Sequence, residues 1–396
     1  RTAAAKIRRE VEELEETERD LAEQQKYGPA GAVKRVVDTL LRQNTVQFLA
    51  QRSVLPKYGF PVDVVSLRLT EYSTVELSRD LSMAIVDFAP GAEVVADKRL
   101  WRSVGIEKPP GMEFIIRRWR VCGRCGSLRT WLADQADRDE CEVCGSGELH
   151  RAGTYLHPIF GFVGELVSRS PGDQRPIRQG YLQHFFTDFA GEAPEVQRIN
   201  LGTHQVDALY SRQGQITVLN EGKRSAGYAV CTWCGAAGVA DSGTPSNPHT
   251  PPGRPKAVCS GTPRRVTLGH NYLTDAVEVR LGGSFTRDET LSALHAVLGV
   301  VDAVGIEASD VNGVVHASHE GRNTMVIFDT VPGGAGHARR ISESIPELFS
   351  AALGKVQRCD CGEETSCYGC LRSYRNQIDH ERLTRAFAIS VLSALL

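Results

Sequence analysis

The chain has 396 residues, of which 41% are hydrophobic and 24% charged, and its formal net charge is −2 at pH 7. This length and composition predict a globular protein of two or three domains. The charge excludes a polyanion-binding protein that is basic throughout, but it is compatible with a local basic face.

The chain contains no run of the ~18 or more apolar residues that a membrane span needs, so we expect no membrane partner. The N-terminus lacks the apolar core of a secretion signal. Because it begins with Arg1, the chain is compatible with a piece of a longer polypeptide. We expect a reducing, cytoplasmic environment, in which the eleven cysteines favour metal binding over disulfides.

The first part of the chain is predicted to be helical. Val11, Leu14 and Leu21 recur at helical spacing among alternating charges, which is typical of a solvated connector helix or a short coiled-coil arm. A second amphipathic pattern covers residues 33–51. The two prolines of LPKYGFP then exclude a helix.

The middle of the chain is rich in short runs of strand-forming residues, such as VDVVSLRL, AEVVAD and QITVLNEG. SRDLSMAIVDF is predicted to be a helix that packs on this sheet. After about residue 265, strands such as TMVIFDT alternate with helical patterns such as DETLSALHAVLGVVDAVG, which indicates an α/β domain.

These patterns predict a multi-domain α+β protein. The expected parts are a helical connector or arm (1–52), a β-rich domain with a zinc ribbon (53–155), a β-rich segment with a second zinc site (156–264) and a C-terminal α/β zinc-binding domain (265–396).

The cysteines fall into three sets. The first is two CxxC pairs, Cys122 with Cys125 and Cys141 with Cys144, separated by fifteen residues. Two such turns form a tetrahedral four-sulfur site, and the spacing is that of a zinc ribbon. A thioredoxin-like redox centre needs only one pair, at the end of a strand.

The second set, Cys231, Cys234 and Cys259, lacks a fourth ligand. His249, in the proline-rich loop between these cysteines, is the predicted ligand, and His270 is the alternative. A histidine in a loop is otherwise an ordinary polar surface residue.

The third set places Cys359, Cys361, Cys367 and Cys370 within twelve residues, so the site closes locally. An iron–sulfur cluster also takes four thiolates and is the alternative to zinc. The three sets use all eleven cysteines, and one histidine completes twelve ligands. We therefore predict about three zinc ions in closed, structural sites.

No catalytic residue is predicted. The chain has no GxxxxGK[ST] loop, and the turn VPGGAG at 331–336 is interpreted as close strand–helix packing rather than a phosphate site. Asp329 and His337 resemble a catalytic pair but have no third partner or nucleophile.

Basic and aromatic residues cluster near the first and third cysteine sets. Such residues on metal-stiffened loops suit contacts to phosphates and bases. A solvated or salt-bridged face is the alternative, since Asp379 and Glu381 lie among them. The predicted DNA-binding residues are Arg372, Arg375, Arg382, Arg385, Tyr374, Arg117, Arg118 and Trp119.

FDTVPGGAGHARRI followed by CDCGEETSCYGCLRSYRNQIDH resembles the C-terminal zinc-binding domain of MrfA-type superfamily 2 DNA helicases. That domain also occurs in DISARM DrmB-like anti-phage defence proteins. Upstream, FLAQRSVLPKYGFPVDVVSLRL, the segment from SRDLSMAIVDF to RSVGI, and LGHNYLTDAVEVRL resemble the region that follows the helicase motor domains. The resemblance covers the chain from about residue 45 onward.

The resemblance implies zinc on Cys359, Cys361, Cys367 and Cys370, and DNA as the partner. The sequence lacks the two RecA-like motor domains, so these are expected in cis or in trans. We expect a non-catalytic accessory region of an ATP-dependent helicase in phage defence or DNA repair, which contacts single-stranded DNA or docks the motor. The alternatives are a protein-interaction scaffold without DNA contact and a nuclease that uses Asp329 or His337.

Overall fold

The structure of the chain is a computed structural model. It describes residues 2–27, 30, 31, 33, 34, 37, 63–70, 75–132, 140–147, 149–167, 177, 180, 182–190, 193–202, 204–317 and 322–396. These residues form six α-helices and sixteen β-strands, which confirms a mixed α+β fold. Within this part of the chain, no helix has the length and apolar character that crossing a membrane requires.

The N-terminal helix α1 (Thr2–Glu23) confirms the first helical prediction. Leu14 is buried and packs with Val37, and Val11 and Val33 cover this contact. Most of the second predicted helix and the LPKYGFP loop lie outside the described residues.

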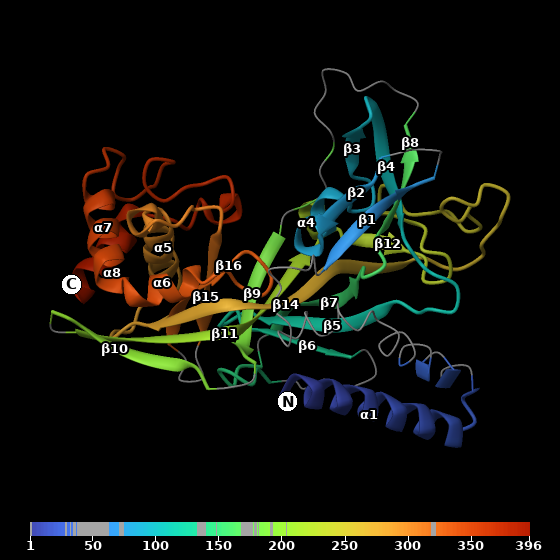
Figure 1. The fold of residues 1–396 in the computed structure, drawn as a ribbon, viewed down its shortest axis with the longest axis horizontal. Coiled ribbons are helices and arrows are strands. Elements are labelled where there is room, and N and C mark those ends of the chain that lie inside the picture. The colour runs from blue at the N-terminus through green and yellow to red at the C-terminus, as the bar shows by residue number, and fades with distance from the viewer. Residues whose placement is uncertain are drawn as a thin grey trace.

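A five-stranded sheet lies at one end of the molecule (Figure 1), in the order β2-β1-β8-β4-β3. Helix α4 (Leu81–Asp87) packs beside it, as predicted for SRDLSMAIVDF, and Asp80 caps the helix by accepting from the Ser82 amide at 2.9 Å. The strands are β1 (Val64–Leu69), β2 (Leu77–Asp80), β3 (Glu93–Ala96), β4 (Arg99–Ile106) and β8 (Phe162–Leu166).

An eleven-stranded sheet forms the body of the protein. Its central pair, β11 and β14, has 17 residues in each strand and runs toward the first sheet (Figure 1). The strands are β5 (Ile115–Cys122), β6 (Leu128–Leu132), β7 (Leu149–His157), β9 (Leu182–Phe189), β10 (Glu195–Leu201), β11 (His204–Asn220), β12 (Tyr228–Val230), β13 (Ala237–Val239), β14 (Arg264–Arg280), β15 (Val311–Ala317) and β16 (Asn323–Asp329). This sheet combines strands that lie on both sides of the domain boundaries expected at residues 155 and 264.

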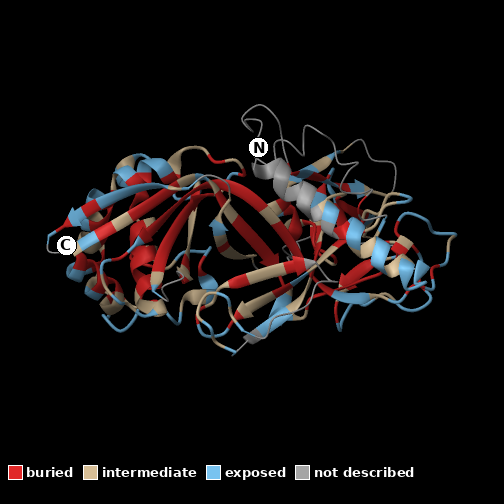
Figure 2. Ribbon diagram, turned by 90° about the horizontal axis from the view of Figure 1, so that it is seen from below, coloured by how far each residue is buried: buried red, intermediate tan, exposed pale blue. Residues whose placement is uncertain are grey.

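Four helices cover the other end of this sheet (Figure 1): α5 (Arg287–Leu298), α6 (His337–Glu343), α7 (Ile345–Gln357) and α8 (Arg385–Leu395). Helix α5 begins with a capping box, in which Thr286 and Glu289 bond to each other's backbone amides. Leu294, Phe349 and Leu392 of these helices share one buried core with Met325 of β16. Burial continues from the helices through the long strands (Figure 2).

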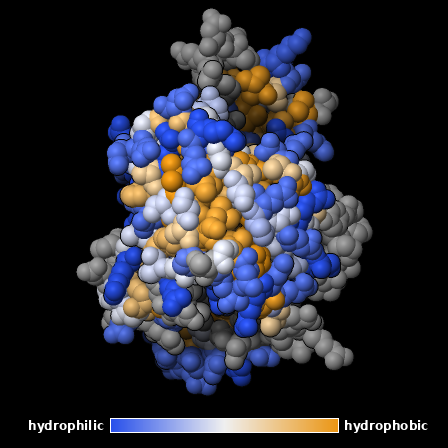
Figure 3. Space-filling model, turned by 90° about the vertical axis from the view of Figure 1, so that its left-hand side faces the viewer, coloured by the Kyte–Doolittle hydropathy of each residue, from blue (hydrophilic) through white to orange (hydrophobic). Residues whose placement is uncertain are grey.

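The end of the molecule on the left of Figure 1 has a band of hydrophobic side chains surrounded by polar ones (Figure 3). Grouped apolar side chains on a surface are typical of protein contacts, whereas single ones are ordinary.

Candidate functional site: three cysteine clusters and an arginine-lined cleft

The structure brings the twelve predicted ligands together in three clusters of four. Within each cluster the ligand atoms all lie within 4.8 Å of one another. The clusters are Cys122, Cys125, Cys141 and Cys144; Cys231, Cys234, His249 and Cys259; and Cys359, Cys361, Cys367 and Cys370.

The distances between sulfur atoms distinguish a metal site from a disulfide. The Sγ–Sγ distance is 3.7 Å for Cys122 with Cys144 and 3.6 Å for Cys359 with Cys361. A Zn–S bond of ~2.3 Å in a regular tetrahedron requires an Sγ–Sγ distance of about 3.8 Å, whereas a disulfide requires ~2.0 Å. The clusters are therefore consistent with three structural zinc sites, and none of the eleven cysteines forms a disulfide.

Three of the CxxC turns close in the same way. The carbonyl oxygen of the first cysteine accepts a hydrogen bond of 2.8 Å from the amide of the glycine four positions later, which is Gly126, Gly145 or Gly235. Each of these glycines has a positive φ, between 68° and 83°. A glycine adopts this conformation without the steric cost that a Cβ atom imposes, which is why the sequence places glycine directly after the pair.

His249, rather than His270, completes the second cluster. Its Nε2 lies 3.2 Å from the Cys234 sulfur, and its Nδ1 lies 2.7 Å from the Ser246 carbonyl oxygen. A carbonyl oxygen only accepts, so Nδ1 carries the proton and Nε2 keeps a free lone pair for a metal. His270 is buried in β14, and its Nδ1 lies 3.1 Å from Nε2 of His157.

In each cluster at least one thiol resists ionisation when no cation is present, whereas hydrogen bonds lower the pKa of Cys141 to about 6 and that of Cys367 to about 7. Burial, together with neighbouring thiols, raises the pKa of Cys125, Cys234 and Cys361 to about 12. A metal cation compensates the charge of the thiolates and so removes this resistance. The donor set of each cluster thus fits a zinc ion, which would act as a structural cross-link.

Arg385 supports the third cluster and does not face a nucleic acid. It is 7% exposed, its Nε donates to the Val356 carbonyl oxygen at 2.8 Å, and its Nη1 contacts the Cys361 carbonyl oxygen. The prediction of Arg385 as a DNA-binding residue is corrected accordingly, because its guanidinium fastens α8 to the cluster and to the end of α7.

A cleft of about 790 Å³ lies between the first and third clusters. Its walls are the Cys122–Gly126 turn, β9, α5 and the segment from Tyr368 to Arg382. Among the described residues that line the cleft, Asp379 is the one acidic residue, whereas seven residues are cationic. The cationic residues are Arg124, Arg151, Arg287, Lys355, Arg372, Arg375 and Arg382.

Most of these cations have neutral partners. Arg372 donates to the Ser366 hydroxyl at 2.9 Å, and Arg375 donates to the Ala308 and Ser309 carbonyl oxygens at 3.2 and 3.1 Å. Because these acceptors are uncharged, the positive charge remains uncompensated. Arg382 and Arg151 differ, since Arg382 pairs with the carboxylates of Asp288 and Asp379 and Arg151 pairs with that of Glu221.

Arg124 lies in the middle of the first CxxC turn, and it is exposed. Within the described part of the chain it has no hydrogen bond or ion pair, so its charge is available to a ligand. Sequence reasoning did not select Arg124, Arg151 or Arg287. Only the position of Arg124 inside CGRC was a usable signal.

Two exposed tyrosines form the rim of the cleft. Tyr368 and Tyr374 are 57% and 82% exposed, and their ring centroids lie 5.4 Å apart. His380 meets Tyr368 edge-on at 5.6 Å. Exposed aromatic rings beside arginines are suited to stacking on unpaired bases.

The three predicted residues of β5 have different environments. Arg118 is exposed, Arg117 is half-buried, and Trp119 is 3% exposed. The prediction of Trp119 as a DNA contact is corrected, because its ring is covered. Instead, the Arg151 guanidinium lies 5.7 Å from the Trp119 ring, which holds this arginine in place.

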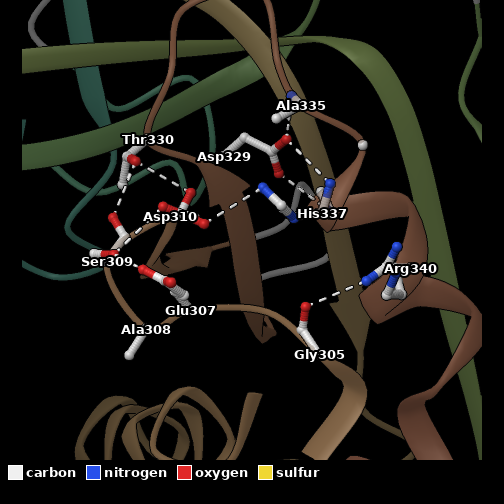
Figure 4. A network of polar contacts seen from close by, with 12 residues as sticks. Gly305, Glu307, Ala308, Ser309, Asp310, Asp329, Thr330, Ala335, His337 and Arg340 are labelled. Atoms are coloured by element: carbon white, nitrogen blue, oxygen red, sulfur yellow. Dashed lines mark hydrogen bonds and ion pairs between the residues drawn. The ribbon is translucent and has the colours of Figure 1, made fainter. Parts of the chain in front are cut away.

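At the loop after β16, Asp329 and His337 make contacts within the protein itself (Figure 4). The carboxylate of Asp329 accepts from the His337 amide at 3.2 Å and from the Ala338 amide at 2.8 Å, and it also accepts from Ala335. The ring of His337 faces Asp310 instead, at 3.7 Å. The amides that a phosphate needs are thus already used to cap α6.

Comparisons with known proteins identify similar sequences and structures. Residues 293–371 match the family profile of the MrfA Zn-binding domain. Druantia protein DruE from Escherichia coli (strain UMEA 4076-1) is 25% identical over 410 residues, which cover 89% of this chain and 22% of DruE. The chain therefore spans about a fifth of the length of this relative.

Solved structures of the DUF1998 helicase MrfA are also similar. The DNA-bound crystal structure matches with a TM-score of 0.40 and the structure without DNA with 0.37, both at 11% identity. Each match covers 84% of this chain and 34% of MrfA. The chain thus contains an MrfA Zn-binding domain and is a distant homologue of Druantia protein DruE.

Proposed function

We propose that the chain is a non-catalytic, zinc-stabilised accessory region of an ATP-dependent superfamily 2 DNA helicase, and that its cleft binds single-stranded DNA. The helicase would act in anti-phage defence or in DNA repair, in the cytoplasm. ATP hydrolysis would belong to motor domains in cis or in trans.

The composition of the cleft is the observation that carries this proposal. Seven cationic side chains and one acidic side chain line the cleft in the described part of the chain, although the net charge of the whole chain is −2. This local concentration of positive charge favours the binding of a polyanion in the cleft. The exposed Tyr368 and Tyr374 favour a strand whose bases are unpaired.

The zinc ions would keep the walls of the cleft in place. Arg124 is part of the first cluster's turn, and Arg372 follows Cys370 of the third. Four-coordinate zinc sites have no open position, so they stabilise the fold rather than catalyse.

The association with a helicase rests on the MrfA Zn-binding domain, and the association with defence rests on the similarity to DruE. Because the chain spans only 22% of DruE, the activity of that whole protein is transferred here as a proposal.

Fluorescence anisotropy with labelled oligonucleotides tests the proposal. We expect the chain to bind single-stranded DNA more tightly than duplex of the same length. The logarithm of affinity should fall with the logarithm of salt concentration with a slope of about −0.7 per phosphate contacted. Absence of binding at low salt would exclude the DNA-binding role.

The hydrophobic band of Figure 3 favours a second candidate function, which is docking of the motor or another protein. A pull-down of the motor that survives nuclease treatment, combined with no binding of DNA, would favour this scaffold over the DNA-binding role.

A further inference from the structure

A second cavity, of about 740 Å³, lies across β5, β7 and the start of β14. Its charged lining consists of Arg118, Arg151, Arg265 and one acid, Glu221. Like the first cleft, it therefore carries an excess of positive charge among its described lining residues.

The two cavities meet at Arg151, which lines both. This side chain is held from three sides. Its Nη2 donates to Gln183 at 2.9 Å and contacts the Glu221 carboxylate, and its guanidinium lies over the Trp119 ring. A polyanion that leaves the first cleft past Arg151 would enter the second cavity directly.

Arg118 and Arg265 are far apart in sequence, and the sheet brings them to the same cavity. Arg118 pairs with Thr154 of β7, and the neighbouring Tyr155 pairs with Thr267 of β14, two residues after Arg265. Both arginines are exposed.

Their charges are also uncompensated. Arg265 donates from Nη2 to the uncharged Ser225 carbonyl oxygen at 3.0 Å. Arg118 makes no hydrogen bond or ion pair with any described residue. Both guanidinium groups are thus free to contact phosphates.

We propose that the second cavity is a further binding site for the phosphodiester backbone, which continues the path of one DNA single strand beyond Arg151. This inference rests on the proposed function of the first cleft. It predicts that the length of DNA strand bound by the protein depends on Arg118 and Arg265. Binding of DNA in the first cleft should not depend on these two arginines.

A length series of oligothymidylates tests this path, because single-strand sites span about 4 to 16 nucleotides. We expect the double variant that carries Arg118→Gln and Arg265→Gln to bind the shortest oligonucleotides as tightly as the wild type does. With the longest, the variant should bind about tenfold more weakly, and its salt slope should be smaller by about 1.4, for two lost phosphate contacts.

Two control variants complete the experiment. Arg124→Gln with Arg375→Gln, in the first cleft, should weaken binding at every length. Arg198→Gln removes an exposed arginine that lines neither cavity, and it should change nothing. Because Arg118 and Arg265 are exposed, thermal unfolding should show the fold of the double variant to be intact.

The outcomes separate the two proposals. Wild-type affinity of the Arg118 and Arg265 variant for the longest oligonucleotides would overturn the second site alone. Equal losses at all lengths would also overturn it, because the two arginines would then belong to the first cleft. Failure of the wild type to bind any oligonucleotide would overturn both proposals.

Discussion

Arg287 donates a hydrogen bond from Nη1 to the carbonyl oxygen of Cys125 at 3.1 Å, and this contact joins the first cysteine cluster to helix α5. The two residues are 162 positions apart in sequence. Burial lowers the pKa of Arg287, yet an arginine remains charged at neutral pH. The contact therefore fixes the spacing between two walls of the cleft.

Replacement of Arg287 should loosen this junction. We expect Arg287→Ala to lower the free energy of unfolding by about 1–3 kcal/mol, because the buried Cys125 carbonyl loses its donor. DNA binding should weaken, while zinc content stays unchanged. Urea unfolding and element analysis check this, with Arg198→Ala as an exposed control. A variant as stable as the wild type would show that the contact does not hold the walls together.

Glycine substitutions separate backbone strain from crowding at the first cluster. Gly126 has a φ of +72°, and a Cβ atom there would lie 2.7 Å from the Arg287 guanidinium. Gly145 has a φ of +68° but open space around it, and Gly147 has open space without the positive φ.

We expect Gly126→Ala to be the most destabilising, Gly145→Ala to cost about 1 kcal/mol of strain, and Gly147→Ala to be near neutral. Chemical denaturation of the three variants measures this order. Equal stability of Gly126→Ala and Gly145→Ala would contradict the close contact with Arg287.

The second cluster predicts a specific effect on metal content. Purified protein should contain about three zinc ions per chain, and His249→Ala should lower this number or weaken retention of one ion against a chelator. His204→Ala is the matched control, because His204 belongs to none of the clusters. Inductively coupled plasma mass spectrometry gives the count, and iron in place of zinc would contradict the assignment.

The environment of His184 predicts a pH effect in the cleft. Burial, together with the positive charge of Arg375, lowers the pKa of His184 to about 4. In the unfolded chain, the pKa of a histidine is about 6.5. The neutral His184 side chain therefore contributes to the stability of the fold above pH 6.5, and this contribution is lost as the pH falls toward 4.

Removal of the neighbouring cation should raise the pKa of His184, since less repulsion then opposes protonation. Arg375→Gln followed by an NMR titration of the histidine signals tests this, and Arg198→Gln is the control. A pKa that stays the same or falls would show that Arg375 does not lie beside His184.

Local sequence patterns were sufficient to predict the metal ligands. The CxxC spacing and the following glycine determine three of the turns without help from the rest of the fold. A loop histidine was needed to complete the second set. The choice of His249 over His270 depended on position in the loop, and the structure places His270 in the core of β14 instead.

The cleft could not be predicted in the same way. It forms because the first cluster, β9, α5 and the C-terminal segment meet in space, and no local pattern encodes that meeting. Trp119 and Arg385 were predicted to contact DNA from their residue type alone, and both are buried. Residue type does not reveal which side of a strand or helix the rest of the fold covers. The eleven-stranded sheet likewise depends on long-range pairing of β7 with β14.

We propose that the arginines of the cleft bind single-stranded DNA. The most direct test is a titration of labelled oligothymidylate with the double variant that carries Arg124→Gln and Arg375→Gln. The control is Arg198→Gln, which removes an exposed arginine elsewhere. We predict affinity reduced at least about tenfold and a salt slope smaller by about 1.4 for the double variant, with wild-type behaviour of the control. Unchanged affinity and salt slope in the double variant would show that these arginines do not bind the DNA.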